Sequence, residues 1–124
     1  MTERIRVLLT IDIVVFVFAA LIHSGWLLAD REDIGAAIAE SVIALVLLAG
    51  LLLSWLRPAA AREAAIAAQG FALLGTCVGL ILVVFVGPTE GLDLTFHSIM
   101  LALLVSGLVV TAGRARNEHT VALR

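Results

Sequence analysis

The sequence predicts an all-α membrane protein, an antiparallel up-down-up-down bundle of four transmembrane helices. Hydrophobic residues make up 62% of the 124 residues, whereas a soluble domain is about 45–50% apolar. A chain of this length has too little interior to bury so much apolar surface in water. The apolar residues also fall into four runs of about 20 residues, the length of a helix that crosses a bilayer. An open sheet would leave backbone groups unpaired in lipid, and the runs lack the alternation of a membrane barrel.

Short polar segments separate the four predicted spans, and residues 1–124 are expected to form one membrane domain. Charged residues interrupt the apolar pattern at 30–33, and Pro58 and Pro88 mark the other two breaks, because proline starts or stops helices. The first span is long and contains Asp12, so we expect it to remain in the protein and not to be a cleaved signal peptide. The predicted spans are residues 5–28, 34–56, 64–86 and 92–112, followed by a short cytoplasmic tail at 113–124.

The placement of arginine predicts the orientation. The chain has no lysine, and the cytoplasmic loops of membrane proteins are enriched in basic residues. In a four-span topology only Arg31 lies on the opposite side from the other arginines. We therefore expect a bacterial cytoplasmic membrane protein with both termini in the cytoplasm. The arginines on the predicted cytoplasmic side are Arg4, Arg6, Arg57, Arg62, Arg114, Arg116 and Arg124.

Several functional classes lack support in the sequence. No basic patch is interleaved with aromatic residues, so nucleic acid is not an expected partner. The motifs of zinc proteases, serine hydrolases, phosphate-binding loops and paired redox cysteines are missing, so no enzyme class is indicated. Cys77 is the one cysteine, lies in an apolar run, and is expected to act as a small packing residue.

Three ionisable side chains within the spans are predicted to lie at one depth. Such groups are costly in a membrane and are therefore candidates for function. At about 1.5 Å of rise per residue, His23, Glu40 and His97 lie roughly 7–9 Å below the outer ends of their spans. Helical spacing places Met100 on the same inward face of the fourth span as His97, a face that also carries Asp93, Leu104, Gly107 and Thr111. The sequence thus predicts a pocket that opens to the outside and is lined by the two histidines, Glu40 and Met100.

The residue types leave four interpretations of this cluster open. It is a set of hydrogen bonds that fixes the helix register, or it lines a pathway for a small molecule or a proton, since a His–Glu pair exchanges protons near neutral pH. Two imidazoles and a carboxylate also suit a divalent transition metal, held by His23, Glu40 and His97, and Met100 would add a preference for copper(I). In the fourth interpretation the two histidines are axial ligands of a haem.

Asp12 is the fourth ionisable residue within a span. It shares a helical face with His23 and is expected in the cytoplasmic third of its span. It is either a second step in a proton or ion path, or the partner of an arginine or of a nearby hydroxyl. The hydroxyls within reach of the inner surface are Thr10, Ser54 and Thr111.

Small and aromatic residues predict contacts of the helices with one another and with the membrane surface. Gly75 and Gly79 form a G-x-x-x-G on the third span, which allows two helix backbones to approach closely. This face either packs inside the bundle or forms a homodimer. Trp26 and Trp55 lie near opposite ends of their spans, where indole rings prefer the membrane interface.

Four segments together resemble a group of small four-span bacterial membrane proteins that is frequent in actinobacteria. They are Phe18-Ala-Ala-Leu-Ile-His23-Ser, Ala37-Ile-Ala-Glu40-Ser, Phe71-Ala-Leu-Leu-Gly75-Thr and Phe96-His97-Ser-Ile-Met100. The resemblance covers most of the chain. It implies a helical bundle in a bacterial membrane and no particular activity.

Two functions from different classes remain. In the first, the chain binds or transports a small ligand, a metal ion or a proton through the pocket of His23, Glu40, His97 and Met100. In the second, it is an accessory subunit that docks its apolar surface onto a larger membrane complex. The second predicts that the polar groups are all paired and that no cavity surrounds them.

Overall fold

The computed structural model describes residues 2–86 and 91–122, without the side chains of Arg31, Leu92 and residues 114–122. Within these ranges the chain is helical and contains no strand, which confirms the predicted all-α class. Each of the four α-helices contains a segment long and apolar enough to cross a bilayer. They are α1 (Thr2–His23), α2 (Ile34–Leu56), α3 (Ala61–Phe85) and α4 (Gly91–Ala122), with short 3₁₀ helices η1 (Ala29–Arg31) and η2 (Pro58–Ala60).

The first helix ends earlier than the predicted limit at residue 28. Gly25 has a φ of 75°, a left-handed conformation that favours glycine, and its N–H donates to the carbonyl of Ile22 at 3.0 Å. The N–H of Asp33 then donates to the carbonyl of His23 at 2.8 Å, which holds the loop against the helix end. His23 is therefore the last residue of α1 and does not lie 7–8 Å below its end, so the depth estimated for His23 is wrong.

The other helix limits follow local signals. Asp33 caps α2, because its side chain accepts a hydrogen bond from the N–H of Ala36 at 3.0 Å. Pro58 begins η2, where a proline without an N–H fits the first helical turn. The fourth helix continues past residue 112, through most of the segment predicted as a tail. The predicted break at Pro88 lies outside the described residues.

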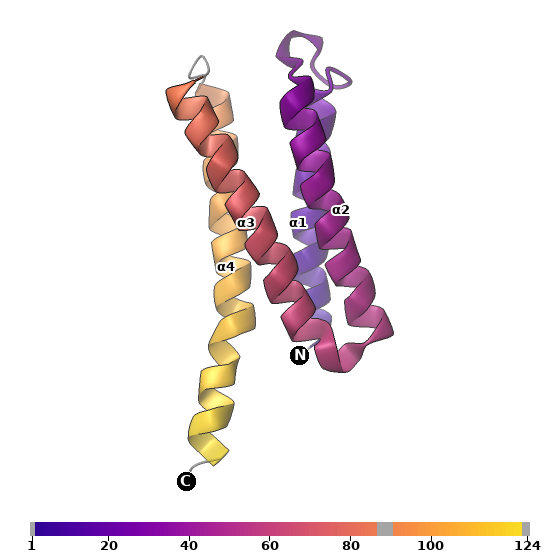
Figure 1. The fold of residues 1–124 in the computed structure, drawn as a ribbon, viewed down its shortest axis with the longest axis vertical. Coiled ribbons are helices and arrows are strands. Elements are labelled where there is room, and N and C mark those ends of the chain that lie inside the picture. Colours follow the sequence, from indigo (N-terminus) through magenta and orange to yellow (C-terminus); the bar gives the residue numbers. More distant parts are fainter. Residues whose placement is uncertain (1, 87–90, 123–124) are drawn as a thin grey trace.

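Helices adjacent in the sequence pack side by side, α1 on α2, α2 on α3 and α3 on α4 (Figure 1). Contacts of α1 with α3 and α4 are far fewer. We therefore describe the fold as a first hairpin (α1 and α2) and a second hairpin (α3 and α4), which contact each other mainly through α2 and α3. The start of α1 and the η2 connection lie at the lower end of Figure 1, and η1 lies at the upper end. We call the lower end, with Arg6, Arg57 and Arg62, the arginine end. The upper end, with Asp30, Glu32, Asp33 and Asp93, is the acidic end.

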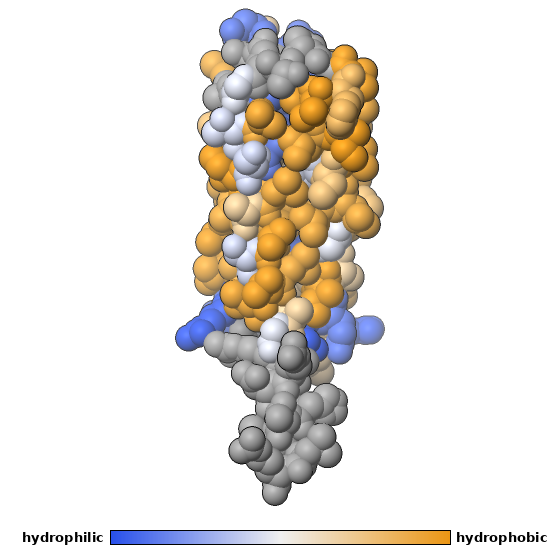
Figure 2. Space-filling model, turned by 90° about the vertical axis from the view of Figure 1, so that its left-hand side faces the viewer, coloured by the Kyte–Doolittle hydropathy of each residue, from blue (hydrophilic) through white to orange (hydrophobic). Residues whose placement is uncertain are grey.

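The core follows the predicted helical faces. In α4 the buried positions recur with helical spacing, as predicted for this face. They are His97, Met100, Leu104, Gly107 and Thr111. Away from the core, large hydrophobic side chains are exposed along every helix, and Figure 2 shows them covering most of one face between hydrophilic groups at its two ends. A surface of this kind suits lipid and not water.

Arginines link the helices of each hairpin at the arginine end. Arg6 of α1 donates to the backbone carbonyl of Ser54 on α2 at 2.9 Å, and its guanidinium lies 3.8 Å from the ring centroid of Trp55. Arg62 of α3 donates to the carbonyl of Thr111 on α4 at 3.0 Å. Trp26 is 85% exposed at the acidic end, so the two indole rings lie near opposite ends of the bundle, as predicted.

The joint between the hairpins depends on small residues. Gly50 of α2 faces α3 so closely that a Cβ there would lie 2.8 Å from Ala68 Cβ and 3.3 Å from the backbone oxygen of Ala64. Neither neighbour has a flexible end that could move aside. The helices therefore approach to a distance that only glycine allows at this position.

We expect Gly50→Ala to lower the free energy of unfolding by about 1–3 kcal/mol, the usual cost of adding a methyl group to a packed interior. Gly70→Ala on α3 is the matched control, because a Cβ there has no atom within 4 Å. The control should be neutral or slightly stabilising, since alanine favours helix by about 1 kcal/mol over glycine. Thermal unfolding in detergent, followed by circular dichroism, measures both. Equal effects of the two substitutions would contradict the close contact.

Candidate functional site

His23 of α1 and Glu40 of α2 are hydrogen-bonded to each other. The His23 Nδ1–H donates to the Glu40 carboxylate, at 2.9 Å to Oε2 and 3.0 Å to Oε1. Glu40 is only 6% exposed, and a buried carboxylate needs such a donor. The structure thus brings together two of the residues that the sequence placed in one cluster.

Asp93 of α4 faces the same pair from the other hairpin. Its Oδ1 lies 3.9 Å from His23 Nε2. The sequence placed Asp93 on one helical face with His97 but did not include it among the site residues. Its position four residues before His97 was the available signal, because residues at this spacing share a helix face.

His97 lies at the junction of α4 and α3. Its Nδ1–H donates to the backbone carbonyl of Asp93 at 2.9 Å, which leaves Nε2 as a bare acceptor in the neutral imidazole. That nitrogen lies 3.0 Å from the position of a Cβ on Gly79, and it has no hydrogen-bond partner among the residues the structure describes. His97 as a whole residue is 9% exposed.

A cavity of about 830 Å³ separates the two hairpins in the half of the bundle near the acidic end. His23 and His97 line it, together with apolar side chains of α2 and α3 and acidic residues at its rim. The apolar lining includes Val42, Ile43, Phe71, Val78, Leu82 and Val83, and the acidic lining consists of Asp30, Glu32, Asp33 and Asp93. A volume of this size is typical of small-molecule sites.

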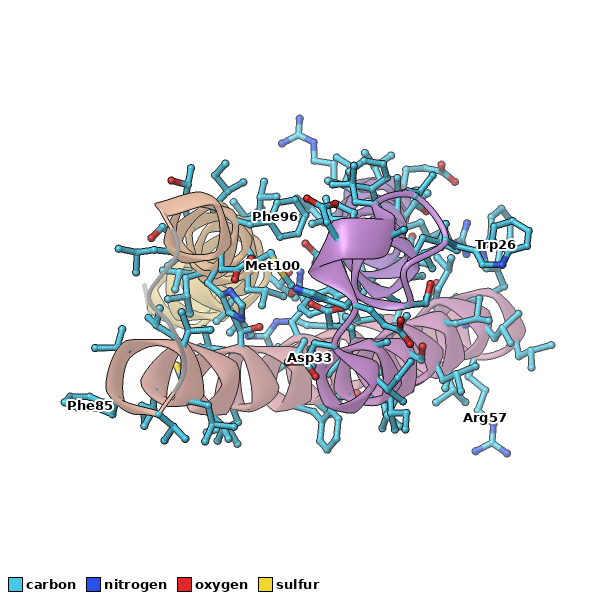
Figure 3. All side chains as sticks on the ribbon, turned by 90° about the horizontal axis from the view of Figure 1, so that it is seen from above. Trp26, Asp33, Arg57, Phe85, Phe96 and Met100 are labelled. Atoms are coloured by element: carbon cyan, nitrogen blue, oxygen red, sulfur yellow. The ribbon has the colours of Figure 1, made fainter. Side chains whose placement is uncertain are left out.

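Two of the four predicted pocket residues do not line the cavity. Glu40 lies behind His23, against which it is paired, and Met100 is only 2% exposed in the core. Seen from the acidic end, Phe96 and Met100 point from α4 toward the first hairpin, whereas Trp26 and Phe85 point away from the bundle (Figure 3). The prediction that Glu40 and Met100 line the cavity is therefore wrong.

The described side chains do not form the predicted metal site. No group of three or more His, Cys, Asp or Glu side chains among them could hold a metal ion. The reason is that His97 Nε2 is directed at Gly79 of α3, while His23 Nδ1 is engaged by Glu40. The set of His23, Glu40 and His97 is therefore not assembled as ligands. The haem interpretation stays a prediction.

Asp12 pairs with a residue that sequence reasoning missed. Gln69 of α3 donates from Nε2 to Asp12 Oδ2 at 2.8 Å, and both side chains are buried. The prediction of an arginine or hydroxyl partner was wrong. Because α1 ends at His23, Asp12 lies near the middle of its helix and not in the cytoplasmic third.

The hydroxyls that were expected to pair with Asp12 are occupied by backbone carbonyls of their own helices. Thr10 donates to Arg6, Ser54 to Leu51 and Thr111 to Gly107. On α4, Gly107 leaves room for the Gln69 amide, since a Cβ there would collide with Gln69 Nε2. A glutamine within an apolar span was the signal that could have found this contact.

The G-x-x-x-G of α3 packs inside the bundle. A Cβ on Gly75 would lie 2.7 Å from Ile43 Cδ1 of α2, and Gly79 faces His97 of α4. The two glycines thus give α3 close contacts with both of its neighbours. This is the packing alternative, and homodimerisation through the same face stays a prediction.

No protein-family model, curated protein or solved structure matches this chain.

Proposed function

We propose that this chain is a small integral membrane protein that binds a small ligand in the cavity between its two hairpins. The observation that carries the proposal is the cavity of about 830 Å³ with the imidazoles of His23 and His97 in its wall. Largely apolar pockets with a few convergent polar groups are the usual form of small-molecule sites. Binding in such a cavity serves either retention of the ligand or the first step of its transport.

The cavity is proposed to open on the outer face of a bacterial cytoplasmic membrane. Arg6, Arg57 and Arg62 gather at the end remote from the cavity, and basic residues favour the cytoplasmic side. This orientation places the N-terminus and the end of α4 in the cytoplasm, in an up-down-up-down arrangement of spans. The acidic rim of the cavity then meets the external medium.

The polar groups favour ligand binding over a purely accessory role. An accessory subunit was expected to have every polar group paired and no cavity. Here His97 Nε2 lacks a partner among the described residues and borders the cavity. Docking of the apolar surface onto a larger membrane complex stays a second prediction, which co-purification of a stoichiometric partner would support.

Cysteine labelling in intact cells tests the proposal. Cys77 is exposed and is first replaced by serine. Ala39 lines the cavity, whereas the neighbouring Ile38 is exposed outside it. A charged, membrane-impermeant thiol reagent should label Ala39→Cys at least about tenfold faster than Ile38→Cys, because thiols react as thiolates, which form in water and not in lipid.

The same experiment separates the two ways in which the proposal could fail. Labelling of Ala39→Cys only after the cells are broken would place the cavity on the cytoplasmic side. Equal resistance of both variants, in intact and in broken cells, would show that water does not reach the cavity.

A further inference from the structure

The charges around the cavity indicate the sign of the charge on its ligand. This inference rests on the proposed function. Among the described lining residues, the carboxylates of Glu32, Asp33 and Asp93 already outnumber the two imidazoles, so they are in excess even when both histidines are protonated. No lysine or arginine stands among the described side chains of the lining, and the side chain of Arg31 in the adjoining loop is not described. A cavity with low-dielectric walls and charges of one sign attracts counter-ions of the other sign.

Glu40 adds one carboxylate behind the wall to those of the lining, to which His23 and Asp93 already belong. Glu40 and Asp93 flank His23 from two sides, at 2.9 Å and 3.9 Å. If His23 is an imidazolium, this group of three carries a net charge of about −1, and if it is neutral the charge is about −2. Whether His23 is neutral or protonated, the group of His23, Glu40 and Asp93 is therefore anionic.

His97 specifies a hydrogen-bond donor on the ligand. Its Nδ1–H is used by the backbone carbonyl of Asp93, and its Nε2 is an acceptor without a partner among the described residues. The imidazole is more than nine-tenths buried and borders the cavity. A ligand with an N–H group at this point would supply the donor that this acceptor lacks.

The remaining walls specify an apolar body. Below the acidic rim the lining consists of aliphatic side chains and Phe71, contributed by α2 and α3. A ligand with a charged head at the rim and a hydrocarbon or aromatic body between the hairpins would satisfy both parts of the cavity.

From these three features we propose that the cavity binds protonated amines with an apolar body, with the ammonium N–H groups directed at His97 and Asp93. Carboxylic acids of the same shape are repelled by the rim. Alcohols of the same shape supply one donor without the charge and bind more weakly.

Binding of three matched compounds tests the proposal. They are 4-phenylbutylamine, 4-phenylbutan-1-ol and 4-phenylbutanoate, measured by calorimetry on the full chain in lipid nanodiscs, with empty nanodiscs to subtract partition into lipid. We expect saturable binding of the amine, binding of the alcohol at least about tenfold weaker, and none of the carboxylate, because a partly buried charge pair is worth one or more kcal/mol.

Two charge-neutralising variants locate the effect. Asp93→Asn removes a rim charge with little change in shape, and we expect it to weaken amine binding about tenfold and leave alcohol binding unchanged. Glu63→Gln makes the same change of charge at the arginine end of α3, on an exposed side chain, and should leave both affinities as they are. Equal weakening in the two variants would overturn the assignment of the amine to the acidic rim.

The outcomes distinguish an error in the proposed ligand class from an error in the proposed ligand-binding function. If the alcohol or the carboxylate binds as tightly as the amine, and Ala39→Trp abolishes that binding while Ile38→Trp does not, the cavity binds ligands but the cationic class is wrong. If none of the three compounds binds saturably, both the ligand class and the proposed function are overturned.

Discussion

Gln69→Leu is expected to lower the free energy of unfolding of the bundle by about 3 kcal/mol, because it leaves the Asp12 carboxyl without its donor in the middle of a membrane helix. Hydrogen bonds between neutral side chains of membrane helices contribute only about 0.6 kcal/mol on average. A carboxylate deprived of its partner loses more, since neither lipid nor apolar core solvates it. The cost of the unpaired carboxylate should therefore determine the loss of stability in Gln69→Leu.

A double variant distinguishes the cost of leaving Asp12 unpaired from the cost of changing the packing at residue 69. Asp12→Val combined with Gln69→Leu removes both polar groups, and replacing both partners by apolar groups is close to neutral. We expect the double variant to recover most of the lost stability. Unfolding in detergent by a graded addition of denaturing surfactant, followed by circular dichroism, gives all three values. A double variant no more stable than Gln69→Leu would contradict this account.

Glu40→Leu is expected to have a comparable effect, a loss of about 3 kcal/mol, because His23 Nδ1 then faces a hydrocarbon side chain. Glu40→Gln is the matched variant. Its amide oxygen can still accept from the imidazole in the same place, so the loss should be near 1 kcal/mol, about the difference between a hydrogen bond to a charged group and one to a neutral group. The same thermal or surfactant unfolding distinguishes the two.

Glu40→Gln also separates stability from binding. The substitution removes one negative charge from behind the cavity wall while keeping the fold, so it should weaken the binding of 4-phenylbutylamine severalfold. If Glu40→Gln unfolds as readily as Glu40→Leu, the charge of Glu40, and not its shape, holds α1 and α2 together. Unchanged amine affinity in a folded Glu40→Gln would show that this carboxylate does not contribute to the field in the cavity.

The helical class and the inward faces were predictable because they depend on spacing within one helix. The recurrence of His97, Met100, Leu104 and Thr111 in α4 was enough to assign that face to the interior. The contact of His23 with Glu40 agrees with their expected neighbourhood, although the depth estimated for His23 was wrong because the predicted end of α1 came too late. The left-handed backbone of Gly25 ends the helix after His23. The φ of a glycine near the end of an apolar run cannot be predicted from the sequence.

The partners of the polar residues were not predictable, because they depend on which helices meet. Asp12 was assigned to residues near the inner surface, and its donor instead comes from the middle of α3. Glu40 and Met100 share the depth of the cavity but differ from His97 in direction, since one is held by His23 and the other fills the core. Depth can be counted along a sequence, whereas the rotation of one helix against another follows from the packing of small residues such as Gly50 and Ala68.

The division into two hairpins has a consequence for biogenesis. The His23–Glu40 pair lies wholly within the first hairpin, so if the proposed membrane protein is made hairpin by hairpin, these two groups pair as soon as α1 and α2 are in place. Asp12 is different, because its donor is on α3 and is made later. In that order of synthesis the Asp12 carboxyl would stay without its donor until α3 packs against α1, so we expect the arrival of the second hairpin to complete the bundle.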